Sequence, residues 1–111
     1  MVNFTRLNQL IRSAARLSYL IKSKDAQRDA DALEICSSVG EELAGMQEEL
    51  KPMIARLDSH EEQMILTLRF IRGYEYPWIA TSLNISERTV FNRLKSAKQR
   101  LKTLFPGQVE A

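Results

Sequence analysis

The chain has 111 residues, of which 44% are hydrophobic and 27% charged, and its formal net charge is +2. This length allows one small domain, or a small domain with an extended element, and the composition is that of an ordinary soluble protein. No stretch approaches the roughly 18 apolar residues that cross a membrane, and the N-terminal segment lacks the apolar centre of a signal peptide. We therefore expect a cytoplasmic protein that does not bind membranes.

Charge is distributed unevenly along the chain. Residues 1–24 carry five basic and no acidic side chains (+5), residues 25–50 carry one base against eight acids (−7), and residues 87–104 carry six bases against one acid (+5). The net charge does not suggest a nucleic acid as partner, whereas the basic segment near the C-terminus does.

The first half of the chain predicts two long helices. Between Phe4 and Ile21 the apolar residues recur at spacings of three and four and form one helical stripe, which residues 23–29 lose. The next helix has an a/d seam at heptad spacing, and such a seam requires another helix to cover it. The seam, which we predict to be an oligomerisation surface, consists of Cys36, Val39, Leu43, Met46, Leu50, Met53 and Leu57.

Two different helices could cover this seam. The first helix of the same chain would give an antiparallel hairpin, and the same helix of a second chain would give a dimer. The opposite charges of residues 1–24 and 25–50 favour the hairpin, and we expect a homodimer in addition. Cys36, the single cysteine, excludes an intramolecular disulfide and is predicted to be a core residue in a reducing compartment.

Pro52 lies within the seam. A proline inside a helix removes one backbone hydrogen bond and clashes with the carbonyl four residues earlier. Because the seam continues in register to Met53 and Leu57, we expect a kinked helix. Two separate helices meeting near Lys51 are the alternative.

A helix start is predicted at Ser59-His60-Glu61-Glu62, ahead of an apolar run. This is a capping box, in which Ser59 accepts from a backbone N–H and Glu62 reaches back. His60, in the exposed first turn, is expected to be solvated. Gly73 is placed to end the helix in the left-handed conformation. The side chains predicted to be buried are Met64, Ile65, Leu68 and Ile71.

Two further helices follow with a short turn between them. Pro77 suits the first position of a short helix, in which Trp78 is predicted to pack in the core. Asn84 tolerates positive φ, and Ser86 caps the last helix, which runs from Glu87 to about Leu104. Inward-facing side chains in the two helices are Ile79, Leu83, Val90, Leu94, Ala97, Leu101 and Leu104. This order of elements is typical of a helix-turn-helix.

The outward face of the last helix suits DNA. Arg88 is predicted to bind guanine O6 and N7, Asn92 adenine N6 and N7, and Phe91 a thymine methyl group. By helical angle this face holds Arg88, Asn92, Lys95, Gln99 and Lys102, with Phe91 and Ser96 at its edges. The side chains predicted to meet phosphates, which add affinity but no sequence information, are Lys95, Lys98, Arg100 and Lys102.

Four runs of residues share a recognisable pattern. They are Leu68-Arg69-Phe70-Ile71-Arg72-Gly73, Trp78-Ile79-Ala80, Leu83-Asn84-Ile85-Ser86 and Thr89-Val90-x-x-Arg93-Leu94-x-x-Ala97-x-x-Arg100-Leu101. Residues 58–104 thereby resemble region 4 of the sigma-70 family. With a helical segment before them, they also resemble phage-encoded sigma-like regulators of the ArpU and RinA kind. The resemblance implies a module that reads a promoter element and contacts RNA polymerase.

The resemblance also implies DNA contacts at particular positions. The matching positions of the recognition helix are Arg88, Thr89, Asn92, Arg93 and Ser96. Sigma-like modules usually have an acidic residue just before the Ile-Ala pair, where this chain has Trp78. We therefore expect no ion pair from that helix to Arg93, which leaves Arg93 for phosphate. No region 2 is recognisable, so we do not expect the chain to open a promoter as a full sigma factor does.

These features together predict an all-α protein. Residues 1–57 are expected to form a helical hairpin or coiled-coil oligomerisation segment, residues 58–105 a three-helix helix-turn-helix of the sigma region 4 kind, and residues 106–111 a tail. The expected partners are double-stranded DNA, a second copy of the chain and RNA polymerase.

The predicted function is sequence-specific DNA binding by a transcriptional regulator of phage or prophage origin. One alternative is a packaging protein resembling small terminase subunits, in which the DNA-binding unit usually comes first. Another is an adaptor that docks on RNA polymerase without reading DNA. The sequence has no nucleophile–base pair, metal cluster or phosphate loop, so we expect no enzymatic activity, cofactor, metal or small-molecule substrate.

Overall fold

The computed structural model describes the backbone of residues 1–21 and 30–110, and the side chains of residues 1–17 and 37–110. In this part of the chain the structure is all-α, as predicted. Its elements are α1 (Phe4–Ile21), α2 (Ala30–Ala55), α3 (His60–Leu66), the π-helical turn η2 (Thr67–Ile71), α4 (Tyr76–Leu83) and α5 (Glu87–Leu104). The connection predicted at residues 23–29 lies outside the described residues.

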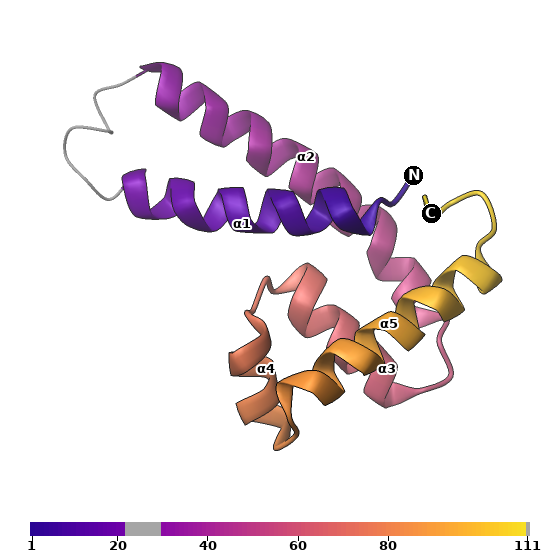
Figure 1. Cartoon of the computed structure of the whole chain (residues 1–111). Helices are drawn as coiled ribbons and strands as arrows, with labels where there is room; N and C mark the ends of the chain where they lie inside the picture. The colour runs from indigo at the N-terminus through magenta and orange to yellow at the C-terminus, as the bar shows by residue number, and fades with distance from the viewer. Residues whose placement is uncertain (22–29, 111) are drawn as a thin grey trace.

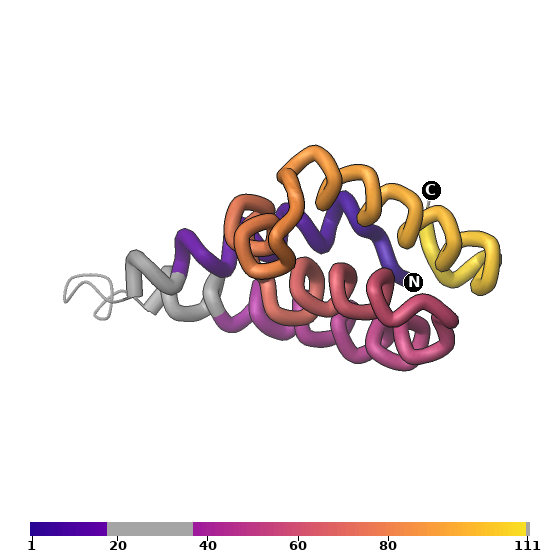
Figure 2. The backbone as a smooth tube through the Cα atoms, turned by 90° about the horizontal axis from the view of Figure 1, so that it is seen from below, coloured from indigo at the N-terminus to yellow at the C-terminus, as the bar shows by residue number. Residues whose placement is uncertain are grey.

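The helices form two sides of a flat molecule. α1 and α2 lie side by side and run in opposite directions, and α3, α4 and α5 gather beneath them (Figure 1). Viewed from below, α1 and α5 occupy the same upper side of the molecule and α2 occupies the lower side (Figure 2). The last helix is therefore presented on a side that it shares with α1.

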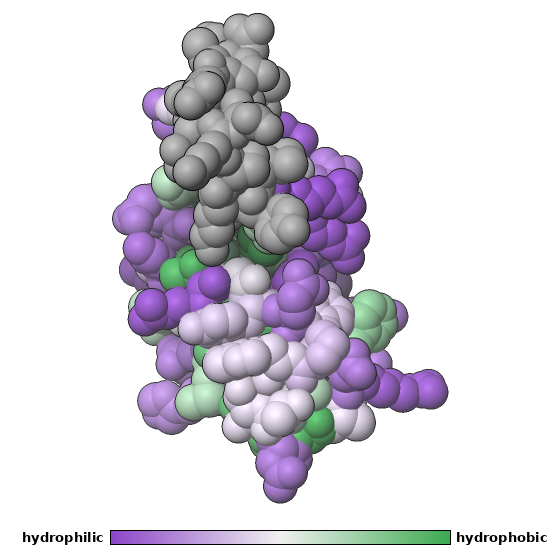
Figure 3. Space-filling model, turned by 90° about the vertical axis from the view of Figure 1, so that its left-hand side faces the viewer, coloured by the Kyte–Doolittle hydropathy of each residue, from purple (hydrophilic) through white to green (hydrophobic). Residues whose placement is uncertain are grey.

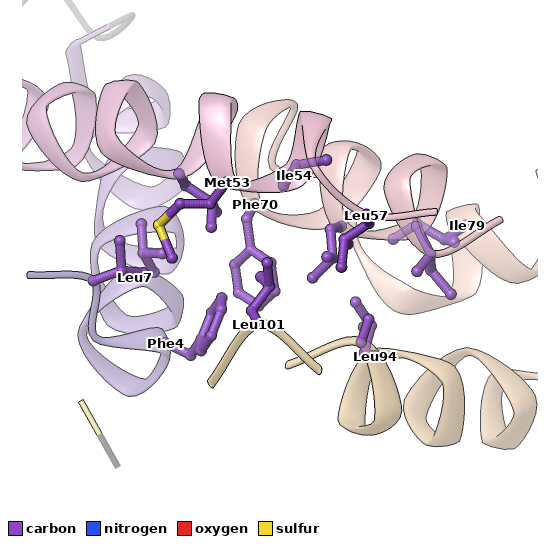
Figure 4. Close-up of a cluster of buried hydrophobic side chains, with 14 of the residues drawn as sticks. Phe4, Leu7, Met53, Ile54, Leu57, Phe70, Ile79, Leu94 and Leu101 are labelled. Carbon is purple, nitrogen blue, oxygen red and sulfur yellow. The ribbon is translucent and has the colours of Figure 1, made fainter. Parts of the chain in front are cut away.

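One hydrophobic core joins the N-terminal helices to the rest of the chain. Figure 4 shows the ring of Phe70 at the centre of this core, with Phe4, Met53 and Leu101 around it. The ring centroids of Phe4 and Phe70 are 5.0 Å apart, a distance typical of favourable aromatic pairs. Buried residues on both sides of residue 57 belong to this cluster, so the core is continuous across the predicted boundary at that residue.

The heptad seam of α2 packs against its own chain. Leu50, Met53 and Leu57 are buried in the core, and Leu43 and Met46 pack against it as half-buried side chains. These side chains therefore stabilise the monomer. A homodimer, which stays a prediction, would require a surface other than Leu50, Met53 and Leu57. Val39 is half-buried, and the side chain of Cys36 lies outside the described residues.

α2 continues through Pro52 and ends at Ala55. The alternative of two helices meeting near Lys51 is therefore wrong. Pro52 itself is exposed, so the carbonyl that loses its helical hydrogen bond to the proline nitrogen lies on the outer side of the helix, where water can satisfy it.

The predicted caps and turns are present in the structure. Ser59 Oγ accepts a hydrogen bond from the backbone N–H of Glu62 at 3.3 Å. Gly73 (φ 75°) and Asn84 (φ 56°) both adopt positive φ. The second half of the capping box differs, because the carboxylate of Glu62 lies toward Arg100, with Oε2 3.3 Å from Nε.

The predicted role of Ser86 as the cap of α5 can be tested directly. Ser86 Oγ accepts a hydrogen bond from Thr89 N at 3.1 Å, and the variant Ser86→Ala should lower the free energy of unfolding by about 1 kcal/mol, measured by urea denaturation. Ser96→Ala, the same change within α5 at an exposed position, is the control and should shift it by less than about 0.5 kcal/mol. Equal losses in the two variants would contradict the capping role.

The π-helical turn was not predicted from the sequence, which indicated one helix up to Gly73. Arg72 N donates to Thr67 O at 2.9 Å, a bond that spans five residues. A π-turn is wider than an α-turn and disturbs the regular pairing of backbone groups. Here Gln47 of α2 donates from Nε2 to the carbonyls of Phe70 at 2.9 Å and Ile71 at 3.3 Å. The end of η2 is therefore tied to α2.

Three side chains predicted to be buried are exposed. Met64, Trp78 and Leu104 expose 51%, 47% and 50% of their surface. Leu104 occupies the last position of α5, and Trp78 is covered on one side by stacking on Tyr74, with ring centroids 3.9 Å apart. Met64 and Trp78 each lie next to a fully buried residue, Ile65 and Ile79, so they face away from the core. The apolar pattern predicted the buried face of α5 correctly but not that of α3 and η2, where Leu66 and Phe70 are buried instead of Met64.

The C-terminal segment predicted as a tail is bound to the start of the chain. Val2 and Val109 form an isolated parallel β-bridge. Val2 N donates to Gln108 O and Glu110 N donates to Val2 O, both at 2.8 Å. Val2 is fully buried, so this bridge closes the core beside the end of α5.

Candidate nucleic-acid interface

α4, the turn and α5 hold a fixed geometry. Asn84 ends α4 in the left-handed conformation (φ 56°, ψ 47°), and Ile85 N donates to Ala80 O at 3.0 Å. Ala80 and Ile79 of α4 and Val90 of α5 are buried. A small residue, a left-handed turn position and a capped second helix give the arrangement of a helix-turn-helix.

Most of the predicted DNA-binding residues lie together on the outer face of α5. This face is opposite the stripe that α5 buries in the core. Phe91, a large apolar residue, lies on this face with 53% of its surface exposed. The exposed members of the predicted set are Arg88, Phe91, Asn92, Lys95, Ser96 and Gln99.

Thr89 and Arg93 have other contacts. Thr89 Oγ1 and Ser86 Oγ are 2.8 Å apart, so this hydroxyl belongs to the helix cap. Arg93 forms an ion pair with Glu61 of α3. The sequence had suggested that Arg93 is free for phosphate because α4 lacks an acidic partner, but an acid of α3 takes that place.

Lys98 does not point to solvent as a phosphate contact would. Its Nζ lies 5.6 Å from the ring centroid of Phe4 and 5.4 Å from that of Phe70, so the ammonium is directed toward the core. Burial lowers the pKa of Lys98 below its usual value, and the charges of Arg69 and Lys102 lower it further. This position does not favour the predicted phosphate contact of Lys98, which stays a prediction. Lys102 is half-buried.

The charges of α5 are neutralised on one side only. Toward α3, Arg93 pairs with Glu61 and Arg100 with Glu62. Arg93, Glu61 and Arg100 are partly or largely exposed, whereas only 16% of the Glu62 side chain is exposed. Both pairs remove positive charge from that side. Arg88 and Lys95 on the outer face form no ion pair within the described residues, so the positive potential of α5 is directed outward.

The start of α4 adds an exposed aromatic pair that the sequence did not predict. Tyr74 and Trp78 stack at 3.9 Å with their ring planes 23° apart. Figure 3 shows this end of the molecule, where a pale surface of intermediate hydropathy is flanked by strongly hydrophilic side chains. The spacing of four residues between Tyr74 and Trp78 could have indicated this pair, but Trp78 was predicted to lie in the core because tryptophan is usually largely buried.

Two other features are absent from the part of the chain that the structure describes. This part contains no group of three or more His, Cys, Asp or Glu residues that could hold a metal ion. Nor does it contain a helix long and apolar enough to cross a membrane.

A helix-turn-helix with an exposed basic face on its second helix defines a DNA-binding module. Residues 48–101 match the family model described as Sigma-70, region 4. This segment, just under half of the chain, is therefore similar to sigma-70 region 4. The match starts within α2, ahead of the start predicted at residue 58. No curated protein and no solved structure matches the chain.

Proposed function

We propose that this protein is a transcriptional regulator that binds double-stranded DNA in a sequence-specific manner, with α5 in the major groove. The observation that carries the proposal is the exposure of Arg88 and Asn92. They are four residues apart and so lie on one face of the helix, next to its capped N-terminus. The N-terminal part of a recognition helix is the part that contacts base edges.

The chemistry of this face supports base recognition. The guanidinium of Arg88 matches the two acceptors of guanine, and the amide of Asn92 matches the donor and acceptor of adenine. Phe91, exposed beside them, suits a thymine methyl group. Lys95, one turn further along, suits a phosphate. The proposal extends to a phage or prophage origin, which is supported only by the sequence resemblance of residues 58–104.

The first experiment is to select bound duplexes from a random pool and then to measure the affinity of variants at fixed salt. Arg88→Ala and Asn92→Ala should each cost about 1–3 kcal/mol on the selected duplex and relax the preference at one base pair. Lys51→Ala removes one charge from α2, on the other side of the molecule, and serves as the control. If both α5 variants bind the selected duplex as tightly as the control, the assigned recognition face is wrong.

A further inference from the structure

α1 carries unassigned basic side chains on the side of the molecule that it shares with α5 (Figure 2). Arg12 and Arg16 are both exposed and lie four residues apart, so they are on one face of α1. Residues 4–17 contain no acidic side chain. In the described residues, neither arginine pairs with a carboxylate.

The contacts of α1 show which way this face points. Asn8 faces the helix-turn-helix, because its Oδ1 accepts from Arg69 at 3.0 and 3.2 Å. Arg6 faces α2, because it pairs with Glu42 at 2.7 Å. At about 100° per residue, Arg12 lies about 40° and Arg16 about 80° from Asn8, whereas Arg6 lies about 160° from it. The two exposed arginines are thus on the outer side of α1, with Arg12 nearer to the face that contacts Arg69 and Arg16 midway between that face and the one toward α2.

α5 also carries basic side chains on the side that is nearest to α1. The contact of Lys98 with Phe4 marks the side of α5 that adjoins α1. Lys95 and Lys102 lie about 60° and 40° from Lys98 around the helix, between this side and the outward face. On the opposite side, toward α3, arginines are neutralised by glutamates. The basic side chains of α5 that form no ion pair within the described residues and the two arginines of α1 therefore belong to helices on the same side of the molecule.

The distances suit a duplex. Arg12 and Arg16 lie about 12–18 Å along α1 from Phe4, at about 1.5 Å per residue. The major groove is about 12 Å wide, so this separation along α1 is of the same order as the spacing between the two phosphate backbones that flank the groove.

We propose that Arg12 and Arg16 of α1 form a second DNA-binding site, which binds phosphates of the duplex that α5 reads. The inference rests on the proposed function and deepens it. Contacts to phosphate add affinity and position the protein but carry no sequence information. The N-terminal helix would then be part of the DNA-binding surface as well as of the core.

The test measures the affinity for double-stranded DNA as a function of sodium chloride concentration. Each phosphate contact contributes about 0.9 to the slope of log K against log salt. Arg12→Gln/Arg16→Gln should therefore reduce the slope by about 1.8, and weaken binding by about tenfold or more at moderate salt. The loss should be equal on a selected duplex and on a duplex of random sequence.

Two matched variants separate this site from a general effect of charge. Lys51→Gln/Arg56→Gln removes the same charge from two exposed positions, one near the end of α2 and one just after its end, and Arg12→Lys/Arg16→Lys keeps the charge of α1. Both should retain nearly the wild-type slope, and unchanged thermal melting should show that all variants are folded.

The outcomes distinguish the inference from the proposed function. If the α1 glutamine variant has the same slope as the control Lys51→Gln/Arg56→Gln, the second site is overturned. The proposed function would still be supported if the wild-type protein binds DNA and Arg88→Ala weakens that binding. A loss confined to the selected duplex would also overturn it, because phosphate contacts are not sequence-specific. If the wild-type protein binds neither duplex, both proposals fail.

Discussion

Replacing Phe70 with alanine should lower the free energy of unfolding by about 3–5 kcal/mol. Phe70 is fully buried, packs against Phe4 and lies beneath the ammonium of Lys98. Truncation removes the transfer free energy of the ring and leaves a cavity that three elements line. Urea denaturation followed by the fluorescence of Trp78, the single tryptophan, measures the effect.

Phe91→Ala is the matched control, because it makes the same chemical change on the exposed face of α5. It should alter the free energy of unfolding by less than about 0.5 kcal/mol, while weakening DNA binding if Phe91 contacts a base. Equal destabilisation by the two variants would contradict the placement of Phe70 at the centre of the core.

The same experiment tests whether α1 and the helix-turn-helix unfold together. Phe4 lies in α1 and Trp78 in α4, so the fluorescence of Trp78 does not report on Phe4 directly. If the continuous core makes one cooperative unit, Phe4→Ala shifts the transition seen by Trp78. An unshifted transition would mean that residues 1–57 unfold as a separate unit, as their predicted boundary implies.

Local signals in the sequence predicted the helix-turn-helix closely. The bounds of α1 and α5, the left-handed Gly73 and Asn84, and the Ser86 cap all agree with the structure. Each of these features depends on the backbone preferences of a few neighbouring residues. The prediction of exposure at Arg88 and Asn92 holds for a similar reason, since the buried stripe of α5 defines its opposite face.

Features that depend on distant partners could not be predicted. The heptad seam shows that α2 needs a partner, but its spacing does not show whether that partner belongs to the same chain. The π-turn η2 is supported by Gln47, and Arg93 finds Glu61 on another helix. The residues near η2 and Arg93 in the sequence do not predict these contacts, because the contacts form only when the helices pack.

Arg69 is the least predictable of these residues, because an arginine is rarely fully buried. Only 1% of it is exposed. Its Nη1 donates to Tyr74 O at 3.0 Å, its Nε and Nη2 donate to Asn8 Oδ1, and its guanidinium lies 5.1 Å from the ring centroid of Tyr76. Arg69 thus links α1 to the loop that leads into α4.

Asn8→Leu should therefore lower the free energy of unfolding by about 3 kcal/mol or more, because it leaves Nε and Nη2 of a buried cation without their acceptor, while only Nη1 keeps its bond to Tyr74 O. Chemical denaturation gives the value. Asn8→Asp keeps an acceptor and adds a compensating charge, so at neutral pH it should be at least as stable as the wild-type protein. If Asn8→Asp is as unstable as Asn8→Leu, the hydrogen bonds to Arg69 are not what position 8 contributes.

The decisive measurement is a double-mutant cycle with Arg69→Met. Arg69→Met removes the buried charge and keeps much of the apolar volume, so the variant Asn8→Leu/Arg69→Met should be more stable than Asn8→Leu alone. The cost of Asn8→Leu is mainly that of leaving the guanidinium unsatisfied, and that cost vanishes when the guanidinium is absent. We expect an interaction energy of about 1–3 kcal/mol between the two positions. Additive losses would mean that Asn8 and Arg69 act independently, and α1 would then be joined to the helix-turn-helix by the apolar core and not by this polar contact.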